Sequence, residues 1–358
     1  MYKIDIEERV LHFKQPAGTS RGTYTTRRTW LVSVSDGTAV GVGECAPLPQ
    51  LSCDDIPDYQ AVLRRFCDVI EQTGNIPYDD LRDYPSMIFG LETAFLALSN
   101  FRQPKTDALH SVPLLFDTPF ARGQKGIPIN GLVWMGTFDE MRERIEQKLE
   151  QGFHCVKLKI GAIDFESELS LLKKIRERFG PRDVELRVDA NGAFDTEDAL
   201  YKLELLSQYA LHSIEQPIRA GQWANMAELC RDAPLRIALD EELIGINDPD
   251  QKRQLLNIIK PAFIVLKPSL HGGMTGCREW IDTARDMQIG SWITSALESN
   301  IGLNAIAQFC ASVYGTANGS SHSGMMMAQG LGTGQLFTDN IPLSLEIRGD
   351  KLWIKTHQ

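Results

Sequence analysis

The chain has 358 residues, of which 43% are hydrophobic and 23% are charged, and its formal net charge is −10. These proportions are typical of a soluble globular protein and exclude collagen, a coiled coil and an intrinsically disordered chain. The negative charge is unfavourable for binding to phosphate backbones and anionic lipids, so neither nucleic acid nor a membrane surface is expected as a partner. A single hydrophobic core stops growing at roughly 250–300 residues, so the length predicts one large domain with a smaller companion.

The cysteines and the start of the chain indicate a cytoplasmic protein. The seven cysteines are odd in number and show neither a CxxC pair nor a Cys/His zinc spacing, so we expect reduced thiols. The first residues lack the apolar core of a signal peptide, and no run of about 18 apolar residues could span a membrane.

The N-terminal region predicts a small α+β capping domain. Alternating residues around an Asp36-Gly37 turn predict an antiparallel meander with strands at 2–13, 28–35 and 39–44. Apolar residues spaced three and four apart predict helices at 58–72 and 85–100. We assign residues 1–114 to this domain and expect residues 326–358 to complete it, because the tail alternates around Gly349-Asp350 as a hairpin does.

Residues 115–325 predict an α/β domain, a (β/α)8-type barrel of the modified TIM kind. Short apolar strands alternate with amphipathic helices, which is the pattern of parallel βαβ units. The strands are expected at 128–134, 155–160, 184–189, 212–215, 236–240, 263–267, 289–294 and 323–327. A doubly wound open sheet is the alternative, but neither GxGxxG after an early strand nor GxxxxGK[ST] is present.

Five consecutive strands end in a charged residue. In chain order these residues are Lys159, Asp189, Glu215, Asp240 and Lys267, each about one strand–helix unit after the last. The carboxyl ends of barrel strands meet at the rim where barrel active sites are built, so we expect the five charges in one ring. One such charge is usually a polar boundary, whereas five in register indicate a site.

The three carboxylates predict a bound divalent cation. Asp189, Glu215 and Asp240 would repel one another strongly with no cation between them. Oxygen ligands alone favour Mg²⁺, with Mn²⁺ as a substitute, over zinc. Strand alternation allows only one of Asp240 and Glu241 to face the interior, and the spacing favours Asp240. Because Mg²⁺ keeps positions that a carboxylate can occupy, we expect a small anionic carboxylate as substrate.

Lysines flank the carboxylates and predict proton abstraction. Lys159 and Lys267 lie on the strands before and after the three acidic ones. A nearby cation lowers the pKa of a lysine toward the neutral amine that can accept a proton. Deprotonation next to a carboxylate also needs the cation to stabilise the enediolate oxygens. Lys157 and Arg187 point inward by alternation and either form buried ion pairs or contact substrate, while Asn191 either caps a helix or approaches the site.

These segments resemble the enolase superfamily, in its muconate-lactonizing-enzyme-like subgroup. VKLKIG at 156–161 is similar to the KxK motif and VLKP at 265–268 to the second-lysine strand. The segments similar to the three metal-ligand strands are RVDANGAF at 187–194, IEQP at 214–217 and ALDEEL at 238–243. GVGECAPLP at 41–49 is similar to the capping-domain segment, so the resemblance covers nearly the whole chain.

Within the subgroup the sequence is most similar to the o-succinylbenzoate synthases, lyases of menaquinone biosynthesis. SALESNIGL at 295–303 resembles that family's serine-rich seventh-strand segment, and GTSRG at 18–22 its capping loop. The resemblance implies the Mg²⁺-dependent syn dehydration of 2-succinyl-6-hydroxy-2,4-cyclohexadiene-1-carboxylate through an enediolate. It assigns proton removal and return to Lys159 and stabilisation of the intermediate to Lys267.

Seven residues are candidates for contact with the substrate, three from their positions on the strands and turns and four from the resemblance. These are Lys157, Arg187, Asn191, Ser20, Arg21, Ser295 and Glu298. One departure is Ala296, which stands where the family often has a second serine.

Other activities of the superfamily remain open at this point. N-succinylamino acid racemization needs the same two lysines. Dipeptide epimerization is disfavoured because residues 320–330 contain no acidic residue to bind an ammonium group. Muconate cycloisomerization is disfavoured by the succinyl-type loop at 18–22. A non-catalytic scaffold would have no use for five charges at one rim. The sequence does not determine the oligomeric state.

Overall fold

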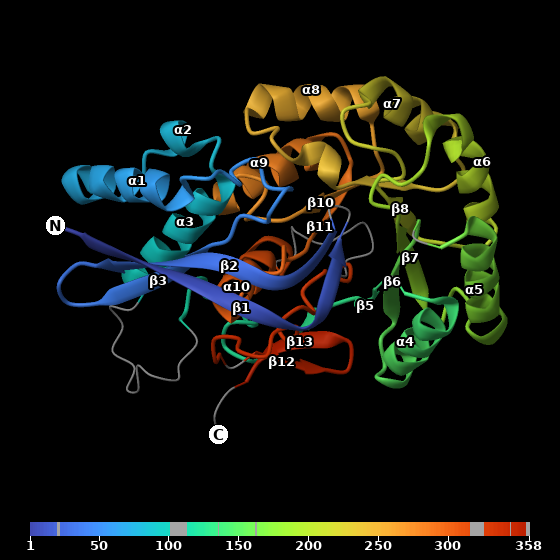
Figure 1. The fold of residues 1–358 in the computed structure, drawn as a ribbon, viewed down its shortest axis with the longest axis horizontal. Coiled ribbons are helices and arrows are strands. Elements are labelled where there is room, and N and C mark those ends of the chain that lie inside the picture. The colour runs from blue at the N-terminus through green and yellow to red at the C-terminus, as the bar shows by residue number, and fades with distance from the viewer. Residues whose placement is uncertain are drawn as a thin grey trace.

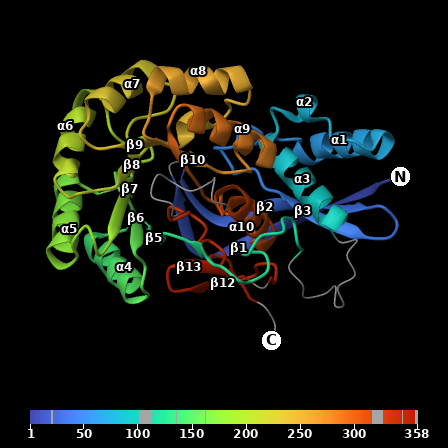
Figure 2. The same cartoon turned by 180° about the vertical axis from the view of Figure 1, so that it is seen from behind.

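A computed structural model describes residues 1–19, 22–100, 113–134, 136–161, 163–315, 326–343 and 345–355. The strands form a capping sheet in the order β1-β2-β3, a parallel sheet running from β11 to β5, and a small sheet in the order β12-β13-β4. The capping sheet and helices α1–α3 lie beside the parallel sheet, whose outer face is covered by helices (Figure 1). The view from behind shows the same division (Figure 2).

The capping sheet is an antiparallel meander, as predicted, but its first two strands are longer. They are β1 (Lys3–Thr19), β2 (Gly22–Ser35) and β3 (Val40–Cys45). The register of β1 on β2 shifts between His12 and Ala17. This irregularity accommodates Pro16, which has no N–H for the ladder, and pairing resumes beyond it.

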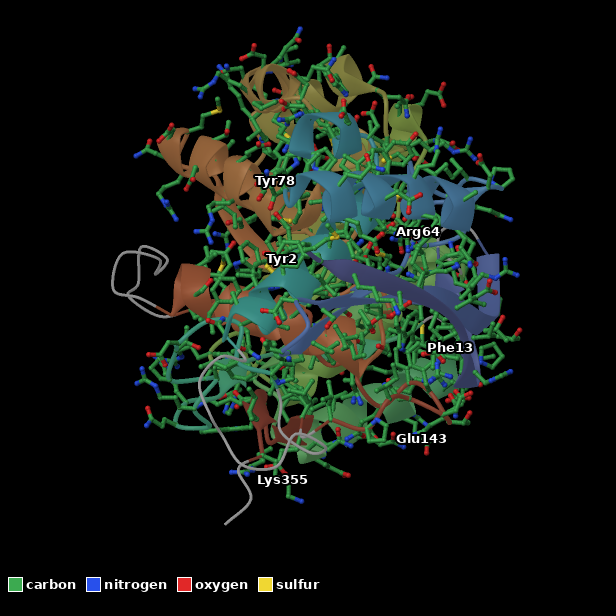
Figure 3. The ribbon with its side chains drawn as sticks, turned by 90° about the vertical axis from the view of Figure 1, so that its left-hand side faces the viewer. Tyr2, Phe13, Arg64, Tyr78, Glu143 and Lys355 are labelled. Carbon is green, nitrogen blue, oxygen red and sulfur yellow. The ribbon has the colours of Figure 1, made fainter. Side chains whose placement is uncertain are left out.

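Three helices cover the capping sheet: α1 (Tyr59–Thr73), α2 (Tyr78–Leu81) and α3 (Pro85–Asn100). Helix α3 approaches β3 very closely, because a β-carbon added at Gly43 would lie 1.8 Å from the carbonyl oxygen of Gly90. Tyr2 packs edge-on against Phe95 of α3, and Arg64 of α1 donates to the Ile4 carbonyl at 2.6 Å. Tyr2 and Arg64 are labelled in Figure 3. The contacts join both helices to the first strand.

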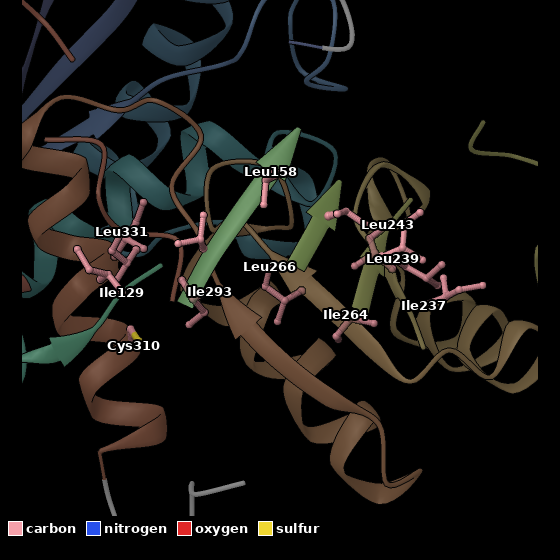
Figure 4. Packing of buried hydrophobic residues seen from close by; sticks show 14 of the residues in the cluster. Ile129, Leu158, Ile237, Leu239, Leu243, Ile264, Leu266, Ile293, Cys310 and Leu331 are labelled. Carbon is pink, nitrogen blue, oxygen red and sulfur yellow. The ribbon is translucent and has the colours of Figure 1, made fainter. Parts of the chain in front are cut away.

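The parallel sheet has seven curled strands in chain order. They are β5 (Gly131–Val133), β6 (Cys155–Lys159), β7 (Glu185–Asp189), β8 (Ser213–Glu215), β9 (Ile237–Leu239), β10 (Phe263–Leu266) and β11 (Gly290–Ile293). Each strand bonds to the next in parallel register, as expected for βαβ units. Buried apolar side chains such as Leu158, Leu266 and Ile293 fill the core (Figure 4).

Helices follow the strands and surround the sheet. They are α4 (Phe138–Glu150), α5 (Phe165–Arg178), α6 (Thr196–Ser207), α7 (Trp223–Asp232), α8 (Pro249–Ile259), α9 (Gly273–Asp286) and α10 (Asn300–Tyr314). Several of these helices begin with a capping residue whose side chain accepts a hydrogen bond from a backbone N–H. Thr137 and Glu140 form a capping box at α4, and Asp248 precedes Pro249 at α8.

A two-residue segment closes the ring of strands. Gln329 forms a parallel bridge with Ile129, and Gly330 forms one with Thr294 next to β11. The Gly330 N–H donates to the Ile293 carbonyl at 2.9 Å. The predicted (β/α)8-type closure is therefore present, but the pairing occurs after the expected range 323–327. Residues 323–325 lie outside the described residues, and Met326 and Met327 pack against the core instead of pairing.

The C-terminal hairpin forms as predicted but joins the barrel instead of the capping sheet. Strands β12 (Leu345–Arg348) and β13 (Lys351–Ile354) pair with each other, and β13 pairs with β4 (Ile127–Pro128). Leu352 of β13 packs into the barrel core, which explains why the hairpin pairs with β4. Upstream, Phe337 bridges to Phe13 of β1, so we propose that the tail after residue 325 serves both domains.

No helix in the described ranges is long and apolar enough to cross a membrane. All seven cysteines are free thiols, and five of them are buried.

Candidate active site

The predicted ring of charges is present at the carboxyl-terminal rim of the barrel. Lys159, Asp189 and Glu215 end strands β6, β7 and β8. The register places Lys159 opposite Asp189 and Asp189 opposite Glu215. Asp240 follows β9 and Lys267 follows β10, so the five side chains stand at the ends of five neighbouring strands.

Lysines and carboxylates alternate within bonding distance around this rim. The Lys157 ammonium lies 2.8 Å from Asp189 Oδ2 and 2.7 Å from Glu215 Oε2. Lys159 Nζ lies 2.7 Å from the same Asp189 oxygen. Lys267 donates to both oxygens of Asp240, at 2.6 Å for Oδ1. Lys157 is thus a partly buried ion-pair partner of two carboxylates, which is one of its two expected roles.

The carboxylates raise the pKa of two of these lysines. Burial alone would lower the pKa of Lys157, but Asp189 and Glu215 outweigh it and raise that pKa. Burial is likewise outweighed at Lys267, whose pKa is raised chiefly by Asp240. The expectation of a lowered lysine pKa concerns Lys159 and Lys267 beside a bound cation and stays a prediction; in the protein alone, the charges nearest to Lys267 are negative.

The three carboxylates differ in their need for positive charge. Burial opposes ionisation of Asp189, but Lys157 and Lys159 hold its pKa below the usual range. Burial raises the pKa of Glu215 well above the usual range, and the charges of Asp189 and Asp240 raise it further. Glu215 therefore receives too little positive charge from the lysines alone.

This donor set fits a hard divalent cation. Asp189, Glu215 and Asp240 offer only oxygen, which Mg²⁺ prefers. Among the described residues no three His, Cys, Asp or Glu side chains converge as a ready metal cage, because the carboxylates turn toward the lysines. The raised pKa of Glu215 shows that another positive charge among the carboxylates would be stabilising.

A cavity of about 340 Å³ opens above this rim. Lys157, Lys159, Glu215 and Lys267 line it, so both flanking lysines reach the same space. Asp189 and Asp240 are almost fully buried behind these side chains. The cavity is of the size that ligand sites of small molecules have.

Asn191 connects Lys159 to a second acidic residue. Its Oδ1 accepts from Lys159 Nζ at 2.7 Å, and its Nδ2 donates to Glu241 Oε1 at 2.9 Å. Both Asn191 and Glu241 line the cavity. Strand alternation predicts that Glu241 faces away from the barrel interior. Strand β9 ends at Leu239 and a 3₁₀ turn follows, so alternation does not apply and both Asp240 and Glu241 reach the rim.

Arg187 does not line the cavity, contrary to the expected substrate contact. Its guanidinium donates to Glu185 Oε1 at 2.8 Å and to the Ala328 carbonyl at 2.9 Å. It also lies over the Trp292 ring, 4.5 Å from the centroid. Because it stands two residues before Asp189 on β7, it lies one layer deeper in the barrel.

The candidates after β11 separate into a cavity residue and a structural one. Ser295 lines the cavity, and its Oγ lies 2.6 Å from Thr333 Oγ1. Glu298 is fully buried and accepts from the Ala296 N–H at 2.7 Å and from Ser269 Oγ. Glu298 was expected to contact the substrate, but its carboxylate instead binds the backbone of Ala296 and the hydroxyl of Ser269. Ser20 and Arg21 lie outside the described residues.

Sequence reasoning missed several apolar residues of the cavity wall. Leu48 and Leu51 come from the capping domain, and Trp134 and Leu297 from the barrel. The GECAPLP segment was recognisable as part of a capping domain, but its contact with the cavity depends on how the two domains pack.

Two family models match the chain. The Enolase C-terminal domain-like family matches residues 140–343, and the MenC N-terminal domain matches residues 8–98. The first match covers more than half of the chain and contains all five charged residues of the rim. The chain therefore belongs to the enolase superfamily, whose members use Mg²⁺.

A close relative narrows this assignment. The o-succinylbenzoate synthase of Desulfotalea psychrophila is 44% identical, and the alignment covers 96% of each chain. The crystal structure of MenC from the same bacterium superposes with a TM-score of 0.80 at 39% identity, covering 99% of both chains. Within the superfamily, the chain is a member of the o-succinylbenzoate synthase family of lyases.

More distant structures share the fold alone. A dipeptide epimerase from Enterococcus faecalis, complexed with Mg and the dipeptide L-Leu-L-Tyr, has a TM-score of 0.78 at 17% identity. The comparison covers 98% of this chain and 96% of that one. The predicted capped barrel is thereby confirmed independently of the activity.

Proposed function

We propose that this protein is an Mg²⁺-dependent o-succinylbenzoate synthase that dehydrates 2-succinyl-6-hydroxy-2,4-cyclohexadiene-1-carboxylate in menaquinone biosynthesis. The observation that carries the chemistry is that Lys159 and Lys267, from opposite ends of the carboxylate row, line one cavity. The 44% identical relative supports this choice of substrate among those of the superfamily.

Lys159 is the proposed base. As a neutral amine it takes the proton from the carbon next to the ring carboxylate, and the electrons of that C–H bond form the enediolate. The same ammonium then gives its proton to the hydroxide that leaves as the C–O bond breaks, so water departs and the amine is restored. Use of one group for both transfers accounts for a syn elimination. Asn191 holds Nζ at 2.7 Å through a neutral acceptor.

Lys267 is proposed to remain charged and to stabilise the negative charge that develops on the substrate. Its ammonium donates to both oxygens of Asp240 and lines the cavity across from Lys159, which suits this role. A preorganised ammonium in a partly buried site stabilises such charge more than water does.

Asp189, Glu215 and Asp240 are the proposed holders of Mg²⁺, with Mn²⁺ as a substitute. When bound, the cation supplies positive charge to the oxygens of the substrate carboxylate. Lys157 is proposed to divide its donors between these ligands and that carboxylate, since it lines the cavity and bonds to Asp189 and Glu215. The free, mostly buried cysteines support a reducing, cytoplasmic location.

The test is turnover by purified protein with Mg²⁺. Loss of cyclohexadiene absorbance should accompany formation of the aromatic product and should stop in excess chelator. A parallel reaction with N-succinyl amino acids in deuterium oxide measures α-deuterium incorporation. Fast dehydration with slow incorporation supports the proposal, whereas fast incorporation without dehydration would identify the protein as an N-succinylamino acid racemase.

A further inference from the structure

A buried arginine connects the capping domain to the rim of the barrel. Arg27 on β2 is only 1% exposed and donates to four backbone carbonyls. Two belong to the capping domain, namely Ala46 at 2.6 Å and Pro47. The other two follow β11 in the barrel, namely Leu297 at 3.2 Å and Ala296 at 3.4 Å.

Both backbone segments form walls of the substrate cavity. Leu48 follows Pro47 and lines the cavity from the capping domain, while Ala296 and Leu297 line it from the barrel. Leu48, Ala296 and Leu297 belong to one buried apolar cluster. The guanidinium therefore ties together two walls that come from different domains.

The barrel wall is held in a conformation that a leucine does not favour. Leu297 has a φ of 64°, in the left-handed region that residues with a β-carbon rarely adopt. Arg27 binds the carbonyls of Ala296 and Leu297, while Glu298 binds the Ala296 N–H at 2.7 Å. A strained segment persists only where its surroundings determine it, and Arg27 is a large part of those surroundings.

The contacts of Arg27 are specific for a guanidinium. Within the described part of the chain, no carboxylate forms a direct ion pair with it; four carbonyls bind the guanidinium, and the charges of buried Glu298 and Glu44 act on it from further away. Its planar fork can reach several acceptors at once, whereas a lysine ammonium is a single point. Burial of a charge is unfavourable unless the charge is hydrogen-bonded and compensated, so loss of these carbonyl contacts would destabilise the buried guanidinium.

We propose that Arg27 is a positioning residue for the substrate, fixing the spacing between Leu48 and the Ala296–Leu297 segment and so the fit of the cavity wall. This inference rests on the proposed function. A loosened wall weakens binding of substrate and transition state alike, which raises KM while leaving kcat nearly unchanged.

The experiment compares Arg27→Met and Arg27→Lys with Thr29→Val. Thr29 is a matched control because it is buried on the same strand and donates to Glu44 Oε1 at 2.9 Å; Glu44 joins the capping domain to the barrel at Ser299 and Gly302, beyond residues 296–297. For Arg27→Met we expect KM to rise about tenfold and kcat to change less than about threefold. Arg27→Lys should be intermediate, and Thr29→Val should lower Tm while retaining the wild-type KM.

Two results would overturn the inference. One is a lower Tm in the Arg27 variants with an unchanged KM, and the other is an equal rise of KM in Thr29→Val. If Arg27→Met does not fold, Arg27→Lys decides by the same comparison.

A binding measurement separates this inference from the proposed function. Calorimetric titration of the protein with o-succinylbenzoate, with Mg²⁺ present, measures the affinity of the cavity for this ligand without turnover. Wild-type protein that binds but does not dehydrate contradicts the proposed function, while weaker binding by Arg27→Lys than by wild type still supports the role of Arg27. Equal binding by both proteins contradicts it, and wild-type protein that neither binds nor turns over contradicts both proposals.

Discussion

Lys159 Nζ lies 2.7 Å from Asn191 Oδ1, and the amide of Asn191 donates in turn to Glu241 Oε1 at 2.9 Å. The proposed base is thus held on one side by the carboxylate of Asp189 and on the other by a neutral amide. The amide oxygen is a neutral acceptor that orients the amine without adding negative charge to the site.

Removal of the Asn191 side chain should reduce kcat. Asn191 has a φ of 45°, so glycine can replace it without backbone strain. We expect Asn191→Gly to lower kcat by up to about 100-fold, because small misplacements of a reacting group are that costly. Steady-state kinetics checks this, with Asn191→Ala as the comparison that should also lose stability, because alanine adopts the left-handed conformation less readily than asparagine or glycine. An unchanged kcat in Asn191→Gly would contradict the positioning of Lys159.

Replacement of the two rim lysines should abolish most of the dehydration. Lys159→Ala is expected to lose about 10²–10⁴-fold in kcat, the usual contribution of an acid–base group. Lys267→Ala should lose about 10²–10³-fold, the usual contribution of one group that stabilises developing negative charge. Lys148→Ala is the matched control, because Lys148 lines the same cavity from α4 but bonds to Gln151 instead of the rim. Full turnover by Lys159→Ala would show that the base is another residue.

Mg²⁺ should stabilise the folded protein through Glu215. At about 100 times the dissociation constant, a cation that binds only the folded state adds about 2.7 kcal/mol to the free energy of unfolding. Glu215→Gln should lose most of this gain in thermal unfolding with and without Mg²⁺. Glu242→Gln is the control, because Glu242 accepts from Gly221 and Gln216 and faces away from the rim. Equal Mg²⁺ effects in both variants would remove Glu215 from the proposed ligands.

His212 should make stability fall in mild acid. Burial, with the ring stacked on Phe263, lowers the pKa of His212 to about 4 from an ordinary value of 6.5. Between these pH values His212 is protonated in the unfolded chain but neutral in the folded one. Stability present above pH 6.5 is therefore lost as the pH falls toward 4. The loss is at most about 3 kcal/mol. The free energy of unfolding, measured with urea across this pH range, should change less with pH in His212→Gln than in wild type. An identical pH dependence in both proteins would contradict the role of His212.

Gly43 should not tolerate a β-carbon. Alanine there would meet the Gly90 carbonyl and the backbone of Ala94, neither of which can move alone. We expect Gly43→Ala to destabilise the capping domain by at least about 1–3 kcal/mol, the usual effect of overpacking. Gly18→Ala is the control, since nothing lies within 4 Å of its added β-carbon. Thermal unfolding measures both, and equal Tm values would contradict the close packing of α3 on β3.

The sequence by itself determined the barrel and the members of the charged ring. Alternation of strands and helices predicts parallel pairing, and parallel pairing brings every carboxyl-terminal strand end to one rim. Charges one unit apart, such as Asp189 and Glu215, must then be neighbours. This inference needs only local patterns, which is why it was correct without coordinates.

Only the tertiary structure decided which partner each polar group takes. Glu298 and Arg187 looked like substrate contacts, but their partners are backbone and side-chain groups that lie nearby only in the folded chain. The lysine pKa values depend on the same packing, because Lys267 is closer to Asp240 than to any other charge. The hairpin at 345–354 carried no signal that it would pair with β4. Arg27 meets Leu297 across 270 positions of sequence, and such a contact follows from how two domains dock, which no local pattern of residues encodes.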